Sequence, residues 1–323
     1  MADKADIAGA TVDHAPVMLG EVTAALREFT ARFPAYVLID GTVGEAGHAR
    51  ALCQAAQPVE FVGFDRDPLA LERARTQLAA SPNCVLVHGS YSDAPDVVRR
   101  AWRMGRPVYL LLDLGIGSHQ FASSARGFSY KAHGEELDLR FDVRTGVAAW
   151  QWLRDESVAS IAQAVRDWAE LSQARVVAER LKDAATRGAR TVGEFVAALP
   201  QVLRLDNALA RLFQALRIAV NDELGQLQRF LDGLQAVWSE ERGAARCVVL
   251  SYHSLEDRAV KQAFRDWSSS CECPPKTPVC VCGKVALGRT VTRKPMVPTE
   301  TEIAVNSRSR SARMRIFDAG AWA

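Results

Sequence analysis

The segment YVLIDGTVGEAGH, residues 36–48, predicts the start of an open α/β fold. Its apolar run ends at Asp40 and is typical of a buried parallel strand. Three glycines at three-residue intervals then allow a tight turn before a helix: Gly41, Gly44 and Gly47. In such sheets ligands bind beyond the carboxyl ends of the strands. The segment therefore favours a nucleotide-cofactor loop, and a glycine turn that only connects a strand to a helix stays open as the alternative.

Four later apolar runs repeat the pattern of a strand that ends in polar residues, and a fifth closes the chain. They are residues 59–64, 85–88, 108–112, 247–252 and 314–317. Helical patterns separate most of them, so we expect a doubly wound α/β sheet. Residues 209–234 form a long amphipathic stretch, which predicts packing helices between the fourth and fifth strands.

The composition is that of a soluble globular protein. Of 323 residues, 48% are apolar and 24% are charged, which excludes a disordered chain. No apolar run reaches the length that spans a bilayer, and residues 1–20 are too charged for a secretory signal. We therefore expect a cytoplasmic protein without a membrane partner.

Side chains at the predicted strand ends indicate the cofactor. Asp65 follows the second strand about 25 residues after Asp40, where α/β cofactor folds place an acid for ribose hydroxyls, although a surface carboxylate is the alternative. Tyr91 follows the third strand and is suited to cover an adenine face. Asp113 follows the fourth strand, toward the reacting end of the ligand. Because the loop lacks the G-x-G-x-x-G of dinucleotide dehydrogenases, we expect S-adenosylmethionine.

Several longer blocks together resemble the RsmH (MraW) family. They are HAPVMLGEV, DGTVGEAGH, FDRDP, LLDLGIGSHQF, RGFSY, LDLRFD, FQALRIAVNDEL, YHSLEDRAVK and NSRSRSARMR. The likeness runs from residue 14 to about residue 315. It implies a methyltransferase that acts on N4 of one cytidine in small-subunit (16S) ribosomal RNA, near the decoding centre.

The resemblance also implies a site and a domain plan. The family's cofactor-binding positions fall here on Ala46, Gly47, His48, Asp65, Tyr91, Asp113 and Gln120. A helical domain, at residues 141–212, is expected to interrupt a class I methyltransferase domain formed by residues 1–140 and 213–323. Departures from the family pattern fall at Glu45, Ala46, Gly117, His119 and residues 207–211, and bear on substrate contacts more than on the cofactor.

Methylation of a cytosine amino group needs hydrogen-bond acceptors, because its lone pair is delocalised into the ring. Asp113 and Ser118 are the candidates. His253 follows the fifth strand on the same edge of the sheet and has either a catalytic role or only a hydrogen-bonding one. No Pro-Cys pair follows a strand, which argues against methylation at C5 through a thiolate.

Four of the seven cysteines are closely spaced. Cys271, Cys273, Cys280 and Cys282 form C-x-C-x6-C-x-C within a presumed cytosolic chain. Four thiolates match the tetrahedral preference of zinc, so we expect one structural zinc ion in the cysteine loop, residues 271–282. Four free thiols in an exposed loop are the alternative.

Residues 284–315 are strongly basic and suit phosphate contacts. If residues 314–317 form a strand of the sheet, alternation along the tail, residues 306–315, would place Arg308 and Arg310 on one surface close to the cofactor mouth, with Arg313 left open as a third member. We expect the partner to be small-subunit ribosomal RNA or the assembled subunit, and not DNA. Methylation of another nucleic acid, or a non-catalytic RNA-binding assembly factor, are the alternative functions.

Overall fold

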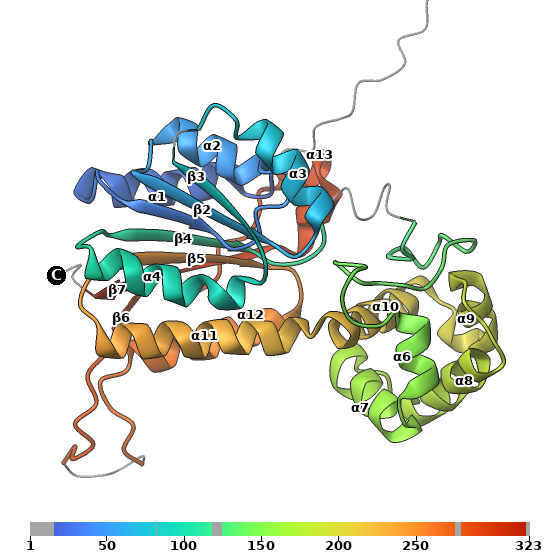
Figure 1. Cartoon of the computed structure of the whole chain (residues 1–323). Coiled ribbons are helices and arrows are strands. Elements are labelled where there is room, and N and C mark those ends of the chain that lie inside the picture. Colours follow the sequence, from blue (N-terminus) through green and yellow to red (C-terminus); the bar gives the residue numbers. More distant parts are fainter. Residues whose placement is uncertain (1–15, 82, 118–124, 275–278, 321–323) are drawn as a thin grey trace, which may run out of the picture.

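The structure is a computed structural model that describes residues 16–81, 83–117, 125–274 and 279–320. One seven-stranded sheet forms its centre, in the order β3-β2-β1-β4-β5-β7-β6 (Figure 1). The strands are β1 (Val37–Asp40), β2 (Glu60–Asp65), β3 (Cys84–His88), β4 (Val108–Asp113), β5 (Ala244–Ser251), β6 (Gly288–Thr290) and β7 (Arg313–Gly320). The strands from β3 to β5 are parallel, whereas β7 runs antiparallel to both β5 and β6.

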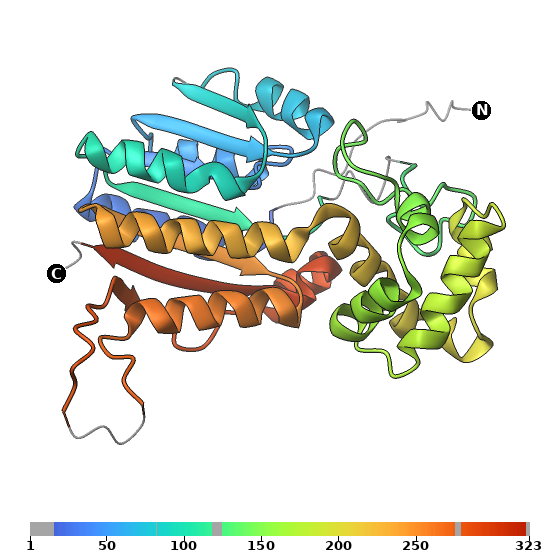
Figure 2. The same cartoon turned by 60° about the horizontal axis from the view of Figure 1, so that its bottom comes forward.

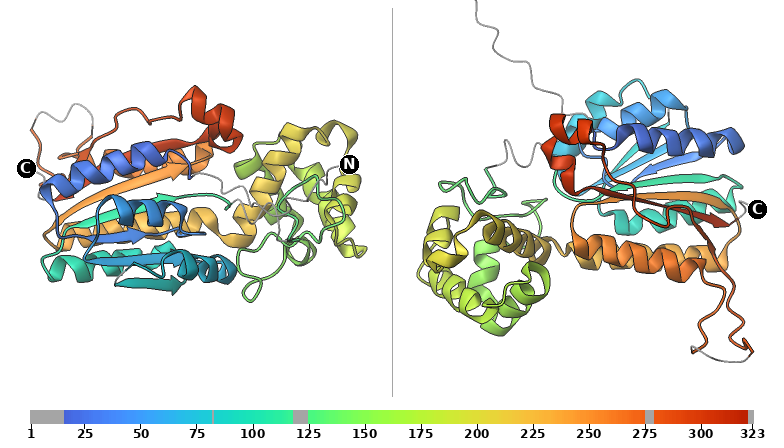
Figure 3. Two further views of the ribbon diagram at one scale, coloured as in Figure 1. Left: turned by 90° about the horizontal axis from the view of Figure 1, so that it is seen from above. Right: turned by 180° about the vertical axis from the view of Figure 1, so that it is seen from behind.

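Helices cover both faces of the sheet, because residues along each strand alternate between two apolar cores. One face packs on α1 (Leu19–Arg32), α2 (Gly47–Ala55) and α3 (Pro68–Gln77). The other packs on α4 (Ala94–Arg103), α11 (Glu223–Glu240) and α12 (Ser254–Ser268). Figure 3 shows these layers from above and from behind. The predicted doubly wound α/β fold is confirmed.

A second group of helices lies beyond the carboxyl ends of the parallel strands (Figures 1 and 2). It contains α6 (Ala149–Asp155), α7 (Val158–Ala169), α8 (Ala174–Thr186), α9 (Val192–Ala198) and α10 (Asp206–Asn221), with the 3-10 turn η2 (Gln201–Leu203). Their apolar core is separate and runs from Phe128 to Leu216. Thr191 and Glu194 form a capping box at the start of α9. The bounds 141–212 for a helical insert remain a proposal.

The long amphipathic stretch 209–234 is divided between two packing helices. It breaks at Asp222, whose φ of 52° is left-handed, so α10 ends at Asn221 and α11 begins at Glu223. The Asn221 amide donates to Leu139 O at 2.7 Å and accepts from Phe141 N at 2.9 Å. These bonds tie the break to the segment that enters the helical group.

Two short elements lie within the basic segment, residues 284–315, before β7 begins. They are α13 (Glu300–Val305) and the 3-10 helix η3 (Ser307–Ser311). The alternation expected for residues 306–315 is therefore wrong before Arg313, since these residues are not extended. Within β7, Asp318 receives two hydrogen bonds, of 2.8 and 3.0 Å, from the guanidinium of Arg246 on β5, and both side chains are fully buried. No helix among the described residues has the length and apolar character needed to cross a membrane.

Candidate active site

The glycine loop leaves the carboxyl end of β1 and turns into α2. Gly41 packs so closely that a Cβ there would lie 2.8 Å from the Cβ of Tyr91. Gly44 and Ala46 have positive φ angles of 51° and 66°, and α2 then begins at Gly47. The turn brings backbone N–H groups and His48 to the edge of the sheet where β2 and β4 also end, as the sequence predicts.

Asp65, the last residue of β2, holds this loop in place. Its Oδ2 accepts a hydrogen bond of 2.8 Å from Gly44 N, and its Oδ1 accepts one of 2.8 Å from Asp67 N. Asp67 in turn caps α3 by accepting from Leu69 N, and Pro68 occupies the first turn of that helix. The predicted place of Asp65 at the end of the second strand is confirmed, and its carboxylate faces the glycine loop.

Asp113 ends β4 between two side chains from distant parts of the chain. The Tyr252 hydroxyl donates a hydrogen bond of 2.6 Å to its Oδ1, and His48 Nδ1 lies 3.5 Å from its Oδ2. Its backbone N donates to Thr42 Oγ1 at 2.7 Å, which joins β4 to the glycine loop. The side chain is 25% exposed, so a ligand can reach it. Burial raises the pKa of Asp113, while His48 and Tyr252 oppose that shift.

The orientation of His48 follows from its second ring nitrogen. Nε2 lies 2.9 Å from Val17 O, and because a carbonyl only accepts, Nε2 carries the hydrogen. Nδ1 is then the atom that faces Asp113. A bare nitrogen and an ionised carboxylate repel each other, so this approach is attractive when the pair shares one proton. His48 and Asp113 are thus arranged to hold a proton jointly.

A third carboxylate, Asp40, lies under the loop at the end of β1 and is 1% exposed. Burial raises its pKa to about 7, the Thr42 backbone N–H opposes that shift, and the nearby Asp113 and Asp65 add to it. Three strand ends therefore bring three acids together. The sequence locates Asp40 at a strand end but does not indicate its perturbed ionisation, which depends on burial.

Tyr91 begins the 3-10 turn η1 (Tyr91–Asp93) after β3, as expected. Its ring packs edge to face on Phe230 of α11, with ring centres 5.7 Å apart, and its hydroxyl donates to Glu223 O at 3.5 Å. The ring therefore has a fixed position beside Gly41. Contact with an adenine remains a proposal.

His253 is the N-cap of α12 and belongs to a buried charged cluster with Glu256, Arg217 and Glu223. Its Nδ1 accepts from Glu256 N at 3.4 Å. Its Nε2 lies 3.0 Å from Glu256 Oε1 but without hydrogen-bond geometry, and has no hydrogen-bond partner among the described residues. Glu223, His253 and Glu256 are close enough to bind a metal, yet Arg217 occupies both Glu223 oxygens at 2.6 and 2.8 Å. That guanidinium disfavours a cation here.

Two predicted site residues, Ser118 and Gln120, lie outside the described residues. Conversely, Tyr252 and Thr42 contact Asp113 but were not singled out from the sequence. Tyr252 immediately precedes His253 at a strand end, so its position in the sequence contains a signal. Its hydrogen bond with Asp113 joins residues 139 positions apart and follows from the pairing of β4 with β5.

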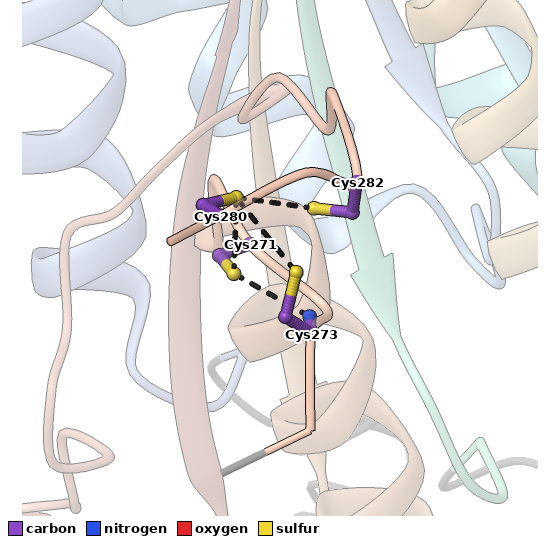
Figure 4. A group of neighbouring side chains, drawn as sticks. All are labelled: Cys271, Cys273, Cys280 and Cys282. Carbon is purple, nitrogen blue, oxygen red and sulfur yellow. Dashed lines mark hydrogen bonds between the residues drawn. The ribbon is translucent and has the colours of Figure 1, made fainter. Parts of the chain in front are cut away.

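The cysteine loop lies at the opposite end of the sheet, beyond the carboxyl end of α12 (Figure 1). Sγ of Cys280 lies 3.4, 3.5 and 3.9 Å from those of Cys271, Cys282 and Cys273 (Figure 4). All four sulfurs lie within 4.8 Å of one another, and all four cysteines are free. Tetrahedral zinc with Zn–S bonds of about 2.3 Å separates its sulfurs by about 3.8 Å. The donor set and its spacing fit that ion.

The strand order with an antiparallel β7, and a glycine loop flanked by acids at the ends of β2 and β4, define a class I S-adenosylmethionine-dependent methyltransferase. The family model described as the MraW methylase family matches residues 11–319. The chain belongs to this family, and the resemblance inferred from its sequence is confirmed.

Individual relatives are similar over nearly the whole chain. Ribosomal RNA small subunit methyltransferase H of Symbiobacterium thermophilum is 40% identical over 311 residues, which cover 94% of this chain and 95% of the relative. The protein of the same name from Geobacter sulfurreducens is 38% identical, with 94% and 98% covered. A solved rRNA methylase from Streptococcus thermophilus covers 96% of this chain and 99% of its own, at 10% identity and a TM-score of 0.36.

Proposed function

We propose that this protein transfers a methyl group from S-adenosylmethionine to N4 of a cytidine in small-subunit ribosomal RNA. Membership of the MraW methylase family, and relatives named for small-subunit ribosomal RNA methylation, support this substrate. The observation that carries the proposal is the carboxylate of Asp113, which lies at the end of β4 between Tyr252 and His48. Ribosomal RNA as the substrate implies that the protein works in the cytoplasm.

The cofactor is proposed to bind along the ends of β1, β2 and β4. Ala46, Gly47 and His48 supply the loop, Asp65 the ribose contact, and Tyr91 the aromatic face. Asp113 and Gln120 complete the predicted set. When bound, S-adenosylmethionine supplies an electrophilic methyl group on its sulfonium. Positive φ angles at Gly44 and Ala46 and the partly exposed Asp65 and Asp113 fit a polar ligand at this edge.

Asp113 is suited to orient and deprotonate the amino group. Its Oδ1 is held by Tyr252, which leaves Oδ2, beside His48, to accept a hydrogen bond from the cytosine NH2. Such a bond directs the nitrogen lone pair toward the methyl group. The proton that leaves N4 passes to Oδ2, where His48 Nδ1 stabilises it. Ser118 remains a second candidate acceptor, and His253 a candidate for contact with the substrate.

The helical insert, residues 141–212, is proposed to recognise the substrate, because its helices lie beyond the strand ends where the cofactor loop opens. Either naked ribosomal RNA or the assembled small subunit satisfies this arrangement. A structural zinc ion is proposed to be held by Cys271, Cys273, Cys280 and Cys282. Since the cysteine loop lies at the far end of the sheet, zinc would stabilise the loop without a part in methyl transfer.

The decisive experiment is nucleoside mass analysis of small-subunit ribosomal RNA from cells with and without this gene. Loss of N4-methylcytidine in the deletion, and its return with the wild-type gene but not with an Asp113→Asn variant, is the expected result. Purified protein with labelled S-adenosylmethionine and either naked RNA or assembled subunits then identifies the form that is methylated. Unchanged N4-methylcytidine in the deletion strain would refute the proposed function.

A further inference from the structure

A pocket lies beside the proposed methyl-transfer site and shares Tyr252 with the surroundings of Asp113. Its volume is about 370 Å³, and its lining includes Tyr252, Ser254, Arg310, Ser311 and Arg313. Tyr252 thus lines this pocket while its hydroxyl bonds to Asp113. The proposed methyl-transfer site and the pocket are therefore neighbours on the same edge of the sheet.

The charge of this pocket is positive. Arg313 donates to Asp257 Oδ2 at 3.0 Å, but the same carboxylate also receives two hydrogen bonds, of 2.7 and 3.1 Å, from Arg315. One acid is thus shared by two arginines. Arg310 is exposed and has no ion pair with any residue in the described ranges. Two positive charges remain without a matching negative charge.

The arginines are held by a well-packed local structure. Arg310 belongs to η3, which is anchored by Ser309, a fully buried residue whose hydroxyl donates to Asn306 O at 2.7 Å. Ala312 N donates to Ser309 O at 2.7 Å, and Arg313 opens β7. On the opposite wall, α12 begins at Ser254, so the positive end of its 15-residue helix dipole adds to the field. His253 also lines the pocket; its buried Nε2 lies 3.0 Å from Glu256 Oε1 but has no hydrogen-bond partner in the described parts of the chain.

We propose that this pocket binds a backbone phosphate of the RNA strand next to the target nucleotide. This inference rests on the proposed function and names a contact that positions its substrate. Guanidinium groups match the geometry of phosphate oxygens, and serine hydroxyls add donors. A target base must leave its stack to be methylated, and a phosphate held beside the site offsets that cost.

The cofactor's own carboxylate is the other oxyanion near this edge. The strand order makes the phosphodiester the better occupant, because β5 and β7 are separated by β4 from the glycine loop after β1. The pocket lies on the β5 and β7 side of Asp113, whereas the proposed cofactor contacts lie on the β1 and β2 side. A substitution in the pocket should therefore weaken the binding of RNA and leave the binding of the cofactor unchanged.

The test compares Arg310→Ala with Arg308→Ala. Both remove one exposed arginine from η3, but Arg308 does not line the pocket. Binding of small-subunit ribosomal RNA transcripts is measured across a range of salt concentrations, and S-adenosylmethionine binding by calorimetry. Arg310→Ala should weaken RNA binding roughly tenfold and reduce the salt slope by about 0.7–0.9. Arg308→Ala should change affinity by less than about threefold, with cofactor binding unchanged in both variants.

Equal losses in the two variants would indicate diffuse attraction and overturn the phosphate pocket. Weaker cofactor binding in Arg310→Ala with intact RNA binding would assign the pocket to the carboxylate instead, and also overturn it. RNA binding does not require turnover, so a failure of the proposed methylation would be seen separately, as wild-type protein that binds RNA without methylating it. Circular dichroism confirms that each variant is folded.

Discussion

The hydroxyl of Tyr252 donates a hydrogen bond of 2.6 Å to Oδ1 of Asp113 and thereby connects the ends of β5 and β4. This bond fixes the carboxylate and lowers its pKa against the raising effect of burial. The two residues are close because β4 and β5 are neighbours in the sheet, with Asp113 paired to Leu250. Tyr252 is thus a positioning residue for the proposed proton acceptor.

Tyr252→Phe should slow methyl transfer about tenfold or more, since hydrogen bonds to charged groups contribute about 1.5–3 kcal/mol. Without the hydroxyl, the pKa of Asp113 should rise further, and the acid limb of the pH–rate profile should move to higher pH. Tyr109→Phe serves as the control. It removes the buried hydroxyl of a tyrosine on β4, which donates a hydrogen bond of 2.9 Å to Val22 O. A slower enzyme with an unmoved profile would argue against this role.

Asp113→Asn should reduce single-turnover methyl transfer at least tenfold while the protein stays folded, because the partly exposed side chain keeps its shape but loses its basicity. The effect on S-adenosylmethionine affinity should be smaller than the effect on transfer. Rapid-quench assays with labelled cofactor measure the rate of methyl transfer, and calorimetry measures the affinity for S-adenosylmethionine. Near-wild-type turnover would show that the acceptor is another group.

Asp65→Ala should weaken S-adenosylmethionine binding at least tenfold, since it removes both the proposed ribose contact and the anchor of Gly44 N. Asp65→Asn should also weaken it, because its NH2 group must face one of the two backbone donors. Glu45→Ala is the matched control, as it removes a loop carboxylate that pairs outward with Arg73 on α3. Calorimetry that finds equal affinities in Asp65→Ala and wild type would exclude the assignment.

Asp40 should make the free energy of unfolding depend on pH. Its folded pKa of about 7 lies above the unfolded value of about 3.9, so the folded state binds more protons between those values. Stability from this residue is therefore lost as the pH rises through that window. Asp40→Asn keeps the acceptor for Thr42 N and should become more stable relative to wild type from about pH 4 to about pH 7, with a constant difference above that window.

Urea unfolding across that range measures the difference. Asp96→Asn alters an exposed carboxylate on α4 and should show no such trend. A constant difference between wild type and Asp40→Asn at all pH values would mean that Asp40 ionises normally in the folded protein.

Protein purified without chelator should contain about one zinc ion per chain, and Cys280→Ser should contain none, since Cys280 lies closest to the other three sulfurs. Zinc should be released as the pH falls, because protonation converts the zinc-binding thiolates into thiols. Methyl transfer should persist in Cys280→Ser. Cys84→Ser, which changes a cysteine outside the loop, is the control. Wild-type protein free of zinc would contradict the proposed site.

The sequence alone predicted the features that depend on residues close to one another along the chain. Strands ending at Asp40, Asp65 and Asp113 were found from apolar runs, and the glycine loop from its spacing. The sequence analysis did not predict the short strand β6. Its three residues contain no apolar run, and among the described strands it pairs with β7 alone. The sequence analysis also did not locate the break at Asp222, because the helical spacing of apolar residues continues through this position without interruption.

Site geometry was harder to foresee than site membership. His48 and Asp113 were each predicted, but their separation of 3.5 Å depends on how α2 packs beside β4. The four cysteines are different, because a spacing of C-x-C twice within a short loop already limits where the sulfurs can lie. Contacts across a sheet edge require the topology, whereas contacts within a loop need only the local chain.

The buried pair of Arg246 and Asp318 sets an order of events during synthesis. Strand β5 emerges from the ribosome well before β7, and until β7 inserts between β5 and β6, Arg246 has Glu28 of α1 as a partner but lacks the fully buried carboxylate of Asp318. Domains generally fold as units as the chain emerges. Here the sheet becomes complete only when its last strand arrives, so nascent chains are expected to present an open edge to chaperones and proteases until translation has passed Gly320.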